Sequence, residues 1–236
     1  MSVPDTHAQR CRFVIGRIAS QAVRAALAIV LVSASVLASG CGSGSSDSSA
    51  SAGGGCKTVD APAPRDPGNH AAPTQPLPRG KTTTLTFDTS CGSFTITLDP
   101  TNAPHASASL AALAKDGYFD DTIFHRVVPG FVIQGGDPTQ IGFGGPGYST
   151  VDPPPKTATY TKGVVAMAKT ETEPAGTAGS QFFVVTGADA GLTPDYAIVG
   201  KVTDGMDTVM RIDALGVGDG SPSQPVVIDR VTVGER

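Results

Sequence analysis

Residues 124–137 have the sequence FHRVVPGFVIQGGD, in which Pro129-Gly130 separates two short apolar runs. This pattern predicts two β-strands joined by a tight turn, because proline and glycine favour turn geometry and interrupt strands. Alternation along the runs would place Arg126, Phe131 and Gln134 on one surface. An arginine among apolar residues is unfavourable unless its donors are used, so this surface is the first candidate for a functional site.

The flanking sequence has the pattern of a β-rich domain. Apolar and polar residues alternate from Thr83 to Leu98 on both sides of a turn at Thr89–Gly92, which predicts a hairpin. A helix is predicted over Asn102–Asp116, with a proline in its first turn and a glycine beyond its end, and a second over Met206–Ala214. Further short β-like runs are separated by Gly/Pro loops: Ile123–Val127, Phe131–Gln134, Val164–Ala168, Phe182–Thr186, Ala197–Val202 and Val226–Val233.

About eight short strands and two helices predict a mainly β fold, a closed eight-stranded antiparallel barrel capped by two helices, because closure removes exposed strand edges. The 236-residue chain is 39% hydrophobic and 16% charged, which allows one sizeable core. Its net charge of −4, without a basic patch, gives no reason to expect a nucleic-acid partner. No Cys/His cluster has the spacing of metal ligands, so no metal is expected.

The first forty residues have the pattern of an export signal. Four arginines precede the uncharged run Ala25–Leu37, and the small residues Ala38-Ser39-Gly40 lead directly into Cys41. This order predicts a secretory signal peptide over residues 1–40, since the apolar run is shorter than the roughly 20 residues of a membrane-spanning helix. Small residues running into a cysteine resemble a bacterial lipobox, which implies a lipidated Cys41. Ordinary signal cleavage with an unmodified Cys41 is the alternative.

Residues 41–80 are predicted to form a disordered tether between this anchor and the folded domain. Gly42–Gly55 is nearly all Gly, Ser and Ala, and Ala61–Pro78 is rich in proline. Neither stretch can bury enough apolar surface to fold independently. The folded domain is therefore predicted over residues 81–236.

Three cysteines remain after the predicted cleavage, namely Cys41, Cys56 and Cys91. With Cys41 lipidated, an exported chain favours oxidation of the other two to a disulfide, and two unpaired cysteines are the alternative. The protein is therefore expected outside the cytoplasm, attached to the cell membrane by its lipid anchor.

A second segment, Gly179-Ser180-Gln181-Phe182-Phe183-Val184, places an amide and two aromatic side chains on another short strand. Together with FHRVVPGFVIQGGD and the runs Gly163–Ala168 and Ile198–Val202, it follows the order and approximate spacing of cyclophilin motifs. The sequence resembles the cyclophilin family of peptidyl-prolyl cis/trans isomerases over residues 83–233.

This resemblance implies a groove on the outer face of the barrel that binds proline-containing peptides without a cofactor. It implies catalytic roles for Arg126, Gln134 and Phe131. The matches to peptide-binding residues are His125, Val132, Ala168, Lys169, Gln181, Phe183, Leu192 and Tyr196. Gly191 stands where cyclosporin-sensitive members carry tryptophan, which implies weak cyclosporin binding.

The chemistry implied is rotation of X-Pro bonds in unfolded exported proteins, by a monomer. Such bonds exchange slowly because amide resonance sets a barrier of roughly 18–20 kcal/mol. A donor such as Arg126 can stabilise the twisted bond, because the proline nitrogen gains a lone pair as resonance is lost. The alternative is a non-catalytic chaperone or scaffold that binds proline-containing peptides in the same groove.

Overall fold

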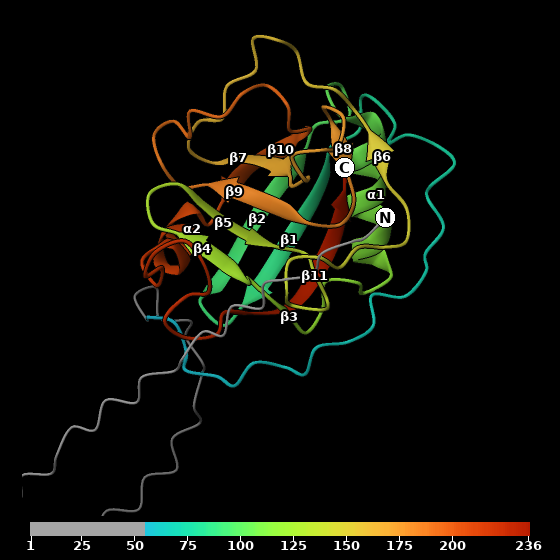
Figure 1. The fold of residues 1–236 in the computed structure, drawn as a ribbon. Coiled ribbons are helices and arrows are strands. Elements are labelled where there is room, and N and C mark those ends of the chain that lie inside the picture. Colours follow the sequence, from blue (N-terminus) through green and yellow to red (C-terminus); the bar gives the residue numbers. More distant parts are fainter. Residues whose placement is uncertain (1–54) are drawn as a thin grey trace, which may run out of the picture. The chain divides into compact units, whose positions relative to one another are not determined.

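The computed structural model describes residues 55–236, which form a curled antiparallel sheet with two helices (Figure 1). The strands are β1 (Thr83–Thr89), β2 (Gly92–Leu98), β3 (Thr122–Ile123), β4 (Arg126–Val128), β5 (Val132–Gly135), β6 (Thr150–Val151), β7 (Val164–Met167), β8 (Thr177–Ala178), β9 (Phe182–Val185), β10 (Ile198–Asp204) and β11 (Val227–Glu235). Nine strands pair in the order β3-β11-β1-β2-β10-β7-β9-β5-β4, and β6 pairs separately with β8. The mainly β architecture predicted from the sequence is confirmed.

The two ends of the sheet, β3 and β4, come from one short segment of chain. Only Phe124 and His125 separate them, yet β3 pairs with β11 whereas β4 pairs with β5. No ladder joins β3 to β4 in the described part of the chain. The predicted closed eight-stranded barrel is therefore not confirmed, and the sheet is a curled one of nine strands. A pattern that predicts one strand over Ile123–Val127 cannot show that its two halves have different partners.

Alternation along the strands separates two apolar clusters on opposite faces of the sheet. In β9, Phe182 and Val184 belong to the main core, whereas Phe183 and Val185 belong to a smaller second cluster. In β5, the neighbouring Val132 also belongs to the second cluster. A strand buried on both faces is apolar throughout, which explains the unbroken sequence of β9. This second cluster underlies the candidate site.

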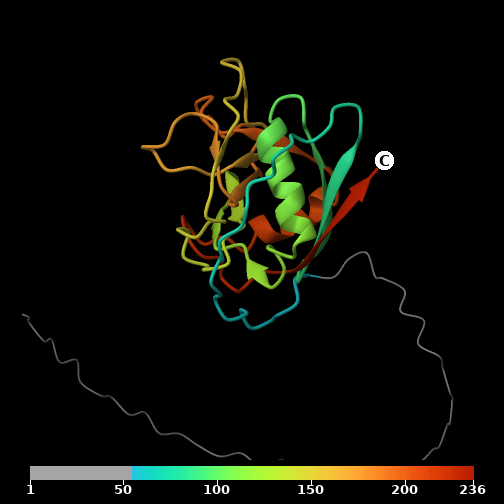
Figure 2. The ribbon, with the colours of Figure 1, turned by 90° about the vertical axis from the view of Figure 1, so that its right-hand side faces the viewer.

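The helices α1 (Pro104–Lys115) and α2 (Met206–Asp213) lie apart from each other in the domain (Figures 1 and 2), and buried apolar residues of both belong to the main core. No side chain of its own N-cap residue caps α1. Instead the carboxylate of Asp152, which is 6% exposed, accepts the N–H groups of His105 at 2.9 Å and Ala106 at 2.7 Å. A carboxylate at this end satisfies free N–H groups and complements the helix dipole. Among residues 55–236, no helix has the length and apolar character needed to cross a bilayer.

Residues 55–80, which we call the arm, precede β1 and contain no helix or strand. The arm lies on the folded domain, where Lys57 N–H donates to Ser90 O at 2.8 Å and Leu77 packs against the main core. This corrects the predicted tether for residues 55–80, because the proline-rich chain finds its hydrogen-bond partners in loops of the domain. The predicted signal peptide, Cys41 and the Gly/Ser-rich stretch to residue 54 lie outside the described residues.

A disulfide joins Cys56 in the arm to Cys91 in the turn between β1 and β2. This settles the two alternatives left open by the sequence in favour of pairing. The bridge spans a sequence separation of 35 residues and encloses the rest of the arm and β1. Closing such a loop lowers the entropy of the unfolded chain.

Reduction of this disulfide is expected to lower the free energy of unfolding by about 3–4 kcal/mol, the magnitude of loop closure for this separation. Urea unfolding with and without dithiothreitol measures the difference. The Cys56→Ala/Cys91→Ala variant is the control and should be about as unstable as the reduced protein and insensitive to reductant. An unfolding curve of the wild type that reduction leaves in place would contradict the prediction.

Candidate functional site

Strand register brings the predicted site residues into one row. Arg126 of β4 pairs with Gln134 of β5, and Gln134 pairs in turn with Phe183 of β9. On the far side of Phe183 lies its partner Ala166 in β7. Directly paired residues of antiparallel strands point to the same face. The guanidinium, the amide and the aromatic ring therefore stand side by side over the second apolar cluster.

The turn between β4 and β5 positions Phe131. Its N–H donates to Val128 O at 3.0 Å, and Gly130 has a φ of +68°, as a type II turn requires. The carboxylate of Asp213, which is 7% exposed, accepts Gly130 N–H at 3.0 Å and the Thr186 hydroxyl at 2.7 Å. This buried carboxylate ties the turn to the end of β9, so the position of Phe131 is fixed from two sides.

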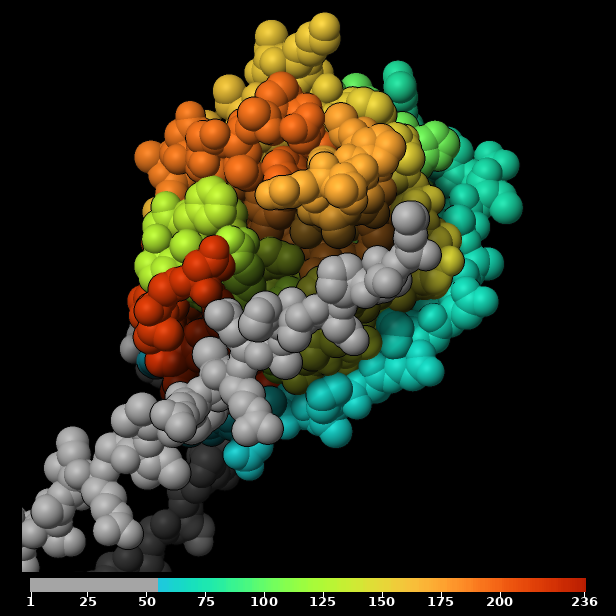
Figure 3. Space-filling model, in the orientation of Figure 1, coloured from blue at the N-terminus to red at the C-terminus, as the bar shows by residue number. Residues whose placement is uncertain are grey.

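A cavity of about 220 Å³ opens over this row of residues. Its wall is largely apolar, and the rings of Phe183 and Tyr196 meet edge to face with centroids 5.6 Å apart. The complete lining is Arg126, Phe131, Val132, Gln134, Ala168, Lys169, Phe183, Leu192 and Tyr196. The surface of this region comes from segments far apart in sequence, near residues 130, 190 and 220 (green, orange and red in Figure 3). Every lining residue is one that the sequence predicts for the site.

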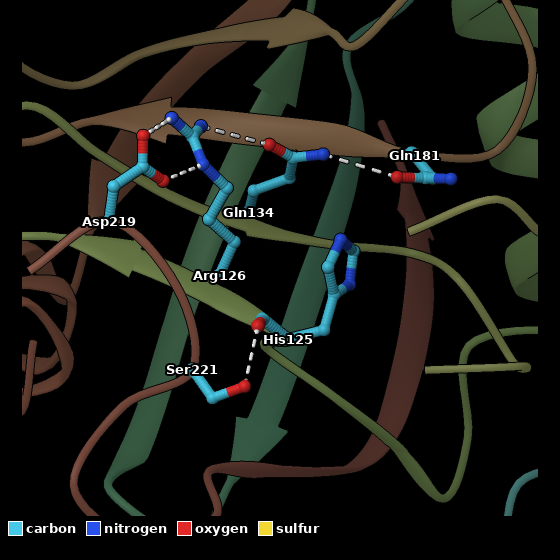
Figure 4. A network of polar contacts seen from close by, with 6 residues as sticks. All are labelled: His125, Arg126, Gln134, Gln181, Asp219 and Ser221. Atoms are coloured by element: carbon cyan, nitrogen blue, oxygen red, sulfur yellow. Dashed lines mark hydrogen bonds and ion pairs between the residues drawn. The ribbon is translucent and has the colours of Figure 1, made fainter. Parts of the chain in front are cut away.

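Hydrogen bonds hold the Arg126 guanidinium from two sides (Figure 4). Nη1 donates to Gln134 Oε1 at 3.2 Å, while Nε and Nη2 donate to the carboxylate of Asp219 at 2.5 and 2.9 Å. Cζ lies 6.0 Å from the ring centroid of Phe131, within the range of a cation–π contact. A guanidinium has five N–H groups, and these contacts use three of them. The side chain is 31% exposed, so it remains accessible at the mouth of the cavity.

Asp219 is a site residue that the sequence does not predict. It lies 93 residues from Arg126, in the loop between α2 and β11. The hydrogen bond from Arg126, together with its charge, lowers the pKa of Asp219, so the carboxylate is ionised at neutral pH. No motif surrounds Asp219, and only the path of the folded loop brings it to the guanidinium.

A larger cavity of about 580 Å³ adjoins the first, and the two share Gln134, Ala168 and Lys169 in their linings. Residues 142–149 form one wall of this second cavity. Gln181 lines it as well, with its Oε1 accepting from Gln134 Nε2 at 3.1 Å (Figure 4). The predicted residue Gln181 therefore connects the two cavities rather than lining the smaller one.

A buried carboxylate organises the loop that forms this wall. Asp137 is fully buried and accepts Thr139 N–H at 2.8 Å, Gly142 N–H at 2.7 Å and Gly144 N–H at 3.1 Å. Burial by itself would raise the pKa of Asp137, but these hydrogen bonds outweigh burial and lower it. A Cβ at Gly144 would lie 1.9 Å from Asp137 Oδ1, so this position requires glycine.

Two predicted residues lie differently from the rest. The Lys169 ammonium donates to the carbonyls of Thr170 and Glu173, each at 3.1 Å, and is 5.5 Å from the ring centroid of Tyr196. His125 lines neither cavity, and both of its ring nitrogens are buried without a partner. The position of His125 thus does not support its predicted contact with a peptide.

The site offers hydrogen-bond donors beside apolar walls, an arrangement that suits a ligand with a ring and backbone carbonyls. In the described part of the chain, no group of three or more His, Cys, Asp or Glu side chains is placed to hold a metal ion.

Comparisons with known proteins agree with this geometry. The family model described as "Cyclophilin type peptidyl-prolyl cis-trans isomerase/CLD" matches residues 84–233. The chain is 36% identical over 151 residues to peptidyl-prolyl cis-trans isomerase-like 1 of Gibberella zeae, covering 61% of this chain and 89% of that protein. It is 35% identical over 170 residues to the probable peptidyl-prolyl cis-trans isomerase A of Mycobacterium leprae, covering 64% and 91%.

A solved structure shows the same fold at a comparable level of identity. The cyclophilin-type isomerase of Cryptosporidium parvum superposes with a TM-score of 0.60 and 30% identity, over 65% of this chain and 98% of that one. The match thus spans nearly the whole of the relative, and the residues matched by the family model include the strands that form the site. The chain belongs to the cyclophilin-type peptidyl-prolyl cis-trans isomerase family.

Proposed function

We propose that this isomerase acts outside the cytoplasm on X-Pro bonds of exported proteins, with Arg126 as the catalytic donor. The observation that carries the assignment is the guanidinium, fixed at the mouth of an apolar cavity by Gln134 and Asp219. A Cryptosporidium parvum relative with 31% identity has been solved in the presence of the dipeptide Ala-Pro. A proline ring beside Phe131 and Phe183 fits the chemistry of the cavity found here.

Rotation requires no covalent step, only selective binding of the twisted bond. Resonance keeps an X-Pro bond planar with a barrier of roughly 18–20 kcal/mol. As the bond twists, the proline nitrogen gains a lone pair, and a donor from Arg126 then binds it more strongly than in the planar state. The apolar wall holds the ring while the rest of the peptide is held outside, so rotation takes place about a single bond.

The partners of Arg126 make its position suitable for this role. Its contacts with Gln134 and Asp219 fix the guanidinium before substrate arrives, so no reorganisation is needed as the bond twists. The guanidinium N–H groups that take part in neither contact are the donors assigned to the proline nitrogen. Asp219 is thus a positioning residue for the catalytic donor.

The remaining predicted residues are assigned to the peptide backbone and its neighbours. Ala168 N–H donates to Gln181 O at 2.9 Å, so this N–H is used within the domain and the Ala168 carbonyl is assigned to the peptide. The larger cavity, between residues 142–149 and Gln181, is assigned to peptide residues that flank the Ala-Pro unit. An unfolded chain can enter both cavities because they share part of their lining.

Export and membrane attachment are part of the proposal. Residues 1–40 would direct export, and a lipid on Cys41 would hold the protein at the outer face of the cell membrane. The Cys56–Cys91 disulfide supports this location, because disulfides persist in oxidising compartments and are rare in the cytosol.

The Arg126→Ala variant is expected to lose isomerase activity on an Ala-Pro peptide by a factor on the order of 10²–10³, the effect of removing a preorganised donor. NMR exchange spectroscopy measures the rate directly, and Arg230→Ala, an exposed arginine on β11, is the matched control. If the wild type binds the peptide but shows no rate above the uncatalysed one, the chain is a peptide-binding chaperone or scaffold instead.

Catalysis is expected to change by less than about twofold between pH 6 and 8, because no titrating group takes part. Burial lowers the pKa of His125, with Arg126 adding to this and Asp137 opposing it, so the imidazole is neutral above its ordinary value of 6.5. The Asp219 pKa is also lowered, so Arg126 keeps its ionised partner throughout. A pH profile of kcat/KM that falls about tenfold from pH 8 to 6, and that His125→Asn flattens, would contradict this.

Metabolic labelling with palmitate is expected to mark the wild-type protein and not the Cys41→Ala variant, since lipidation requires the thiol. The Cys56→Ala/Cys91→Ala variant is the control and should label like the wild type. Equal labelling of wild type and Cys41→Ala would rule out the anchor at this residue while leaving the isomerase assignment intact.

A further inference from the structure

The arm binds the outer side of the loop that walls the larger cavity. Gln140 Nε2 donates to Pro62 O at 2.9 Å, and Arg65 N–H donates to Pro138 O at 3.0 Å. Both contacts lie in the first half of the loop formed by residues 137–148. They join backbone groups of an extended, proline-rich segment to the Gln140 side chain and the Pro138 carbonyl of the loop.

The second half of the same loop is held in the same way. His70 N–H donates to Pro146 O at 2.9 Å. A Cβ at Gly147, whose φ is +86°, would lie 2.3 Å from Asn69 Oδ1, so arm and loop approach each other closely here. The arm therefore follows the loop along its length instead of touching it at one point.

The arm is itself anchored to other parts of the domain. The Arg65 guanidinium donates to the carbonyls of Tyr118, of Asp120 at 3.0 Å and of Gly117 at 3.4 Å. The His70 ring packs edge to face on the Tyr118 ring, with centroids 5.1 Å apart. Figures 1 and 2 show the arm (cyan to teal) passing around the outside of the domain and along α1. Its two ends are fixed by the disulfide and by Leu77.

On its inner side, the same loop is bonded to the predicted site. Gln181 Nε2 donates to Gly142 O at 2.9 Å and to Gly144 O at 3.0 Å. Gln181 in turn accepts from Gln134, which accepts from Arg126 (Figure 4). A continuous series of hydrogen bonds and short loop segments thus runs from the arm to the guanidinium.

Within the loop, the Asp137 carboxylate holds the N–H groups of Thr139, Gly142 and Gly144, and the rest of its support comes from neighbouring segments. Residues 137–148 contain no helix or strand. Gln140 has a φ of +63°, which is uncommon for a residue other than glycine, and Gly142 a φ of +84°. Phe143 is 87% exposed, so its side chain does not anchor the loop to the core. Contacts with neighbouring segments add to the Asp137 bonds in selecting one conformation from the many open to a glycine-rich loop.

We propose that the arm is a positioning element of the peptide site, which holds residues 137–148 in the shape that binds the residues flanking the Ala-Pro unit. Arg65 of the arm and Gln140 of the loop are the positioning residues. This inference rests on the proposed function of the larger cavity. The arm precedes residues 84–233, the part that matches the family, so the cavity of this isomerase is shaped by a segment outside the family domain.

The test compares two ligands on the full-length protein and on the Arg65→Ala/Gln140→Asn variant. Asparagine tolerates a positive φ but is one methylene shorter than glutamine, so the bond to Pro62 is lost without new backbone strain. Arg79→Ala is the matched control, because Arg79 is exposed in the same arm. NMR titration gives Kd for the dipeptide Ala-Pro and for an eight-residue peptide with a central Ala-Pro. Hydrogen exchange follows the amides of residues 137–148.

In the double variant, Kd for the longer peptide is expected to rise about threefold to tenfold, the usual range for residues that act through others. Kd for Ala-Pro should stay within about twofold, the loop amides should exchange faster, and Arg79→Ala should match the wild type. An unchanged Kd for the longer peptide would overturn the inference. An equal rise in Kd for both ligands would also overturn the inference, because that result indicates general destabilisation of the domain. Wild-type protein that binds both ligands without isomerising them would contradict the proposed catalysis and not the role of the arm.

Discussion

The register between β4, β5 and β9 is the constraint on which the site depends. Adjacent residues of a strand point to opposite faces, so a slip of one residue would turn Arg126 into the main core and bring Val127 to the cavity. The type II turn at Gly130 and the buried Asp213 carboxylate prevent this slip, because both fix the start of β5. The geometry of the candidate site is thus a direct consequence of how one short hairpin closes.

The same strands also provide the apolar surface that the site requires. Since β9 is buried on both faces, Phe182 stabilises the core while Phe183 forms the wall of the cavity. Binding surface and folding core are therefore separated by the thickness of one strand. Polar side chains lie at the mouth of the cavity beside this apolar wall. There Asp219 compensates the charge of Arg126 and leaves some of the guanidinium N–H groups accessible.

Local features of the fold were predictable from the sequence, and long-range partners were not. Turn residues and alternation predict the β4–β5 hairpin, and the resemblance to cyclophilin motifs identifies the lining of the smaller cavity. Asp219 binds Arg126, 93 positions away, and Asp152 caps α1 at His105, 47 positions away. The sequence around either aspartate does not indicate these partners. The arm was predicted to be disordered because its proline-rich composition offers too little apolar surface to fold independently. Composition does not reveal that a proline-rich chain, which has little conformational entropy to lose, can be held by the carbonyls and N–H groups of a nearby loop.

The position of the disulfide determines how mechanical load would pass through the molecule. Cys56 lies at the start of the arm and is bonded covalently to Cys91 in the turn between β1 and β2. Tension applied to the chain before Cys56 would therefore enter the sheet directly at that hairpin. The arm from residue 57 to residue 80 lies within the bridged loop and would bear none of it. For as long as this one bond remains oxidised, a pull from the N-terminal side would leave the arm, and the loop that it holds, free of tension.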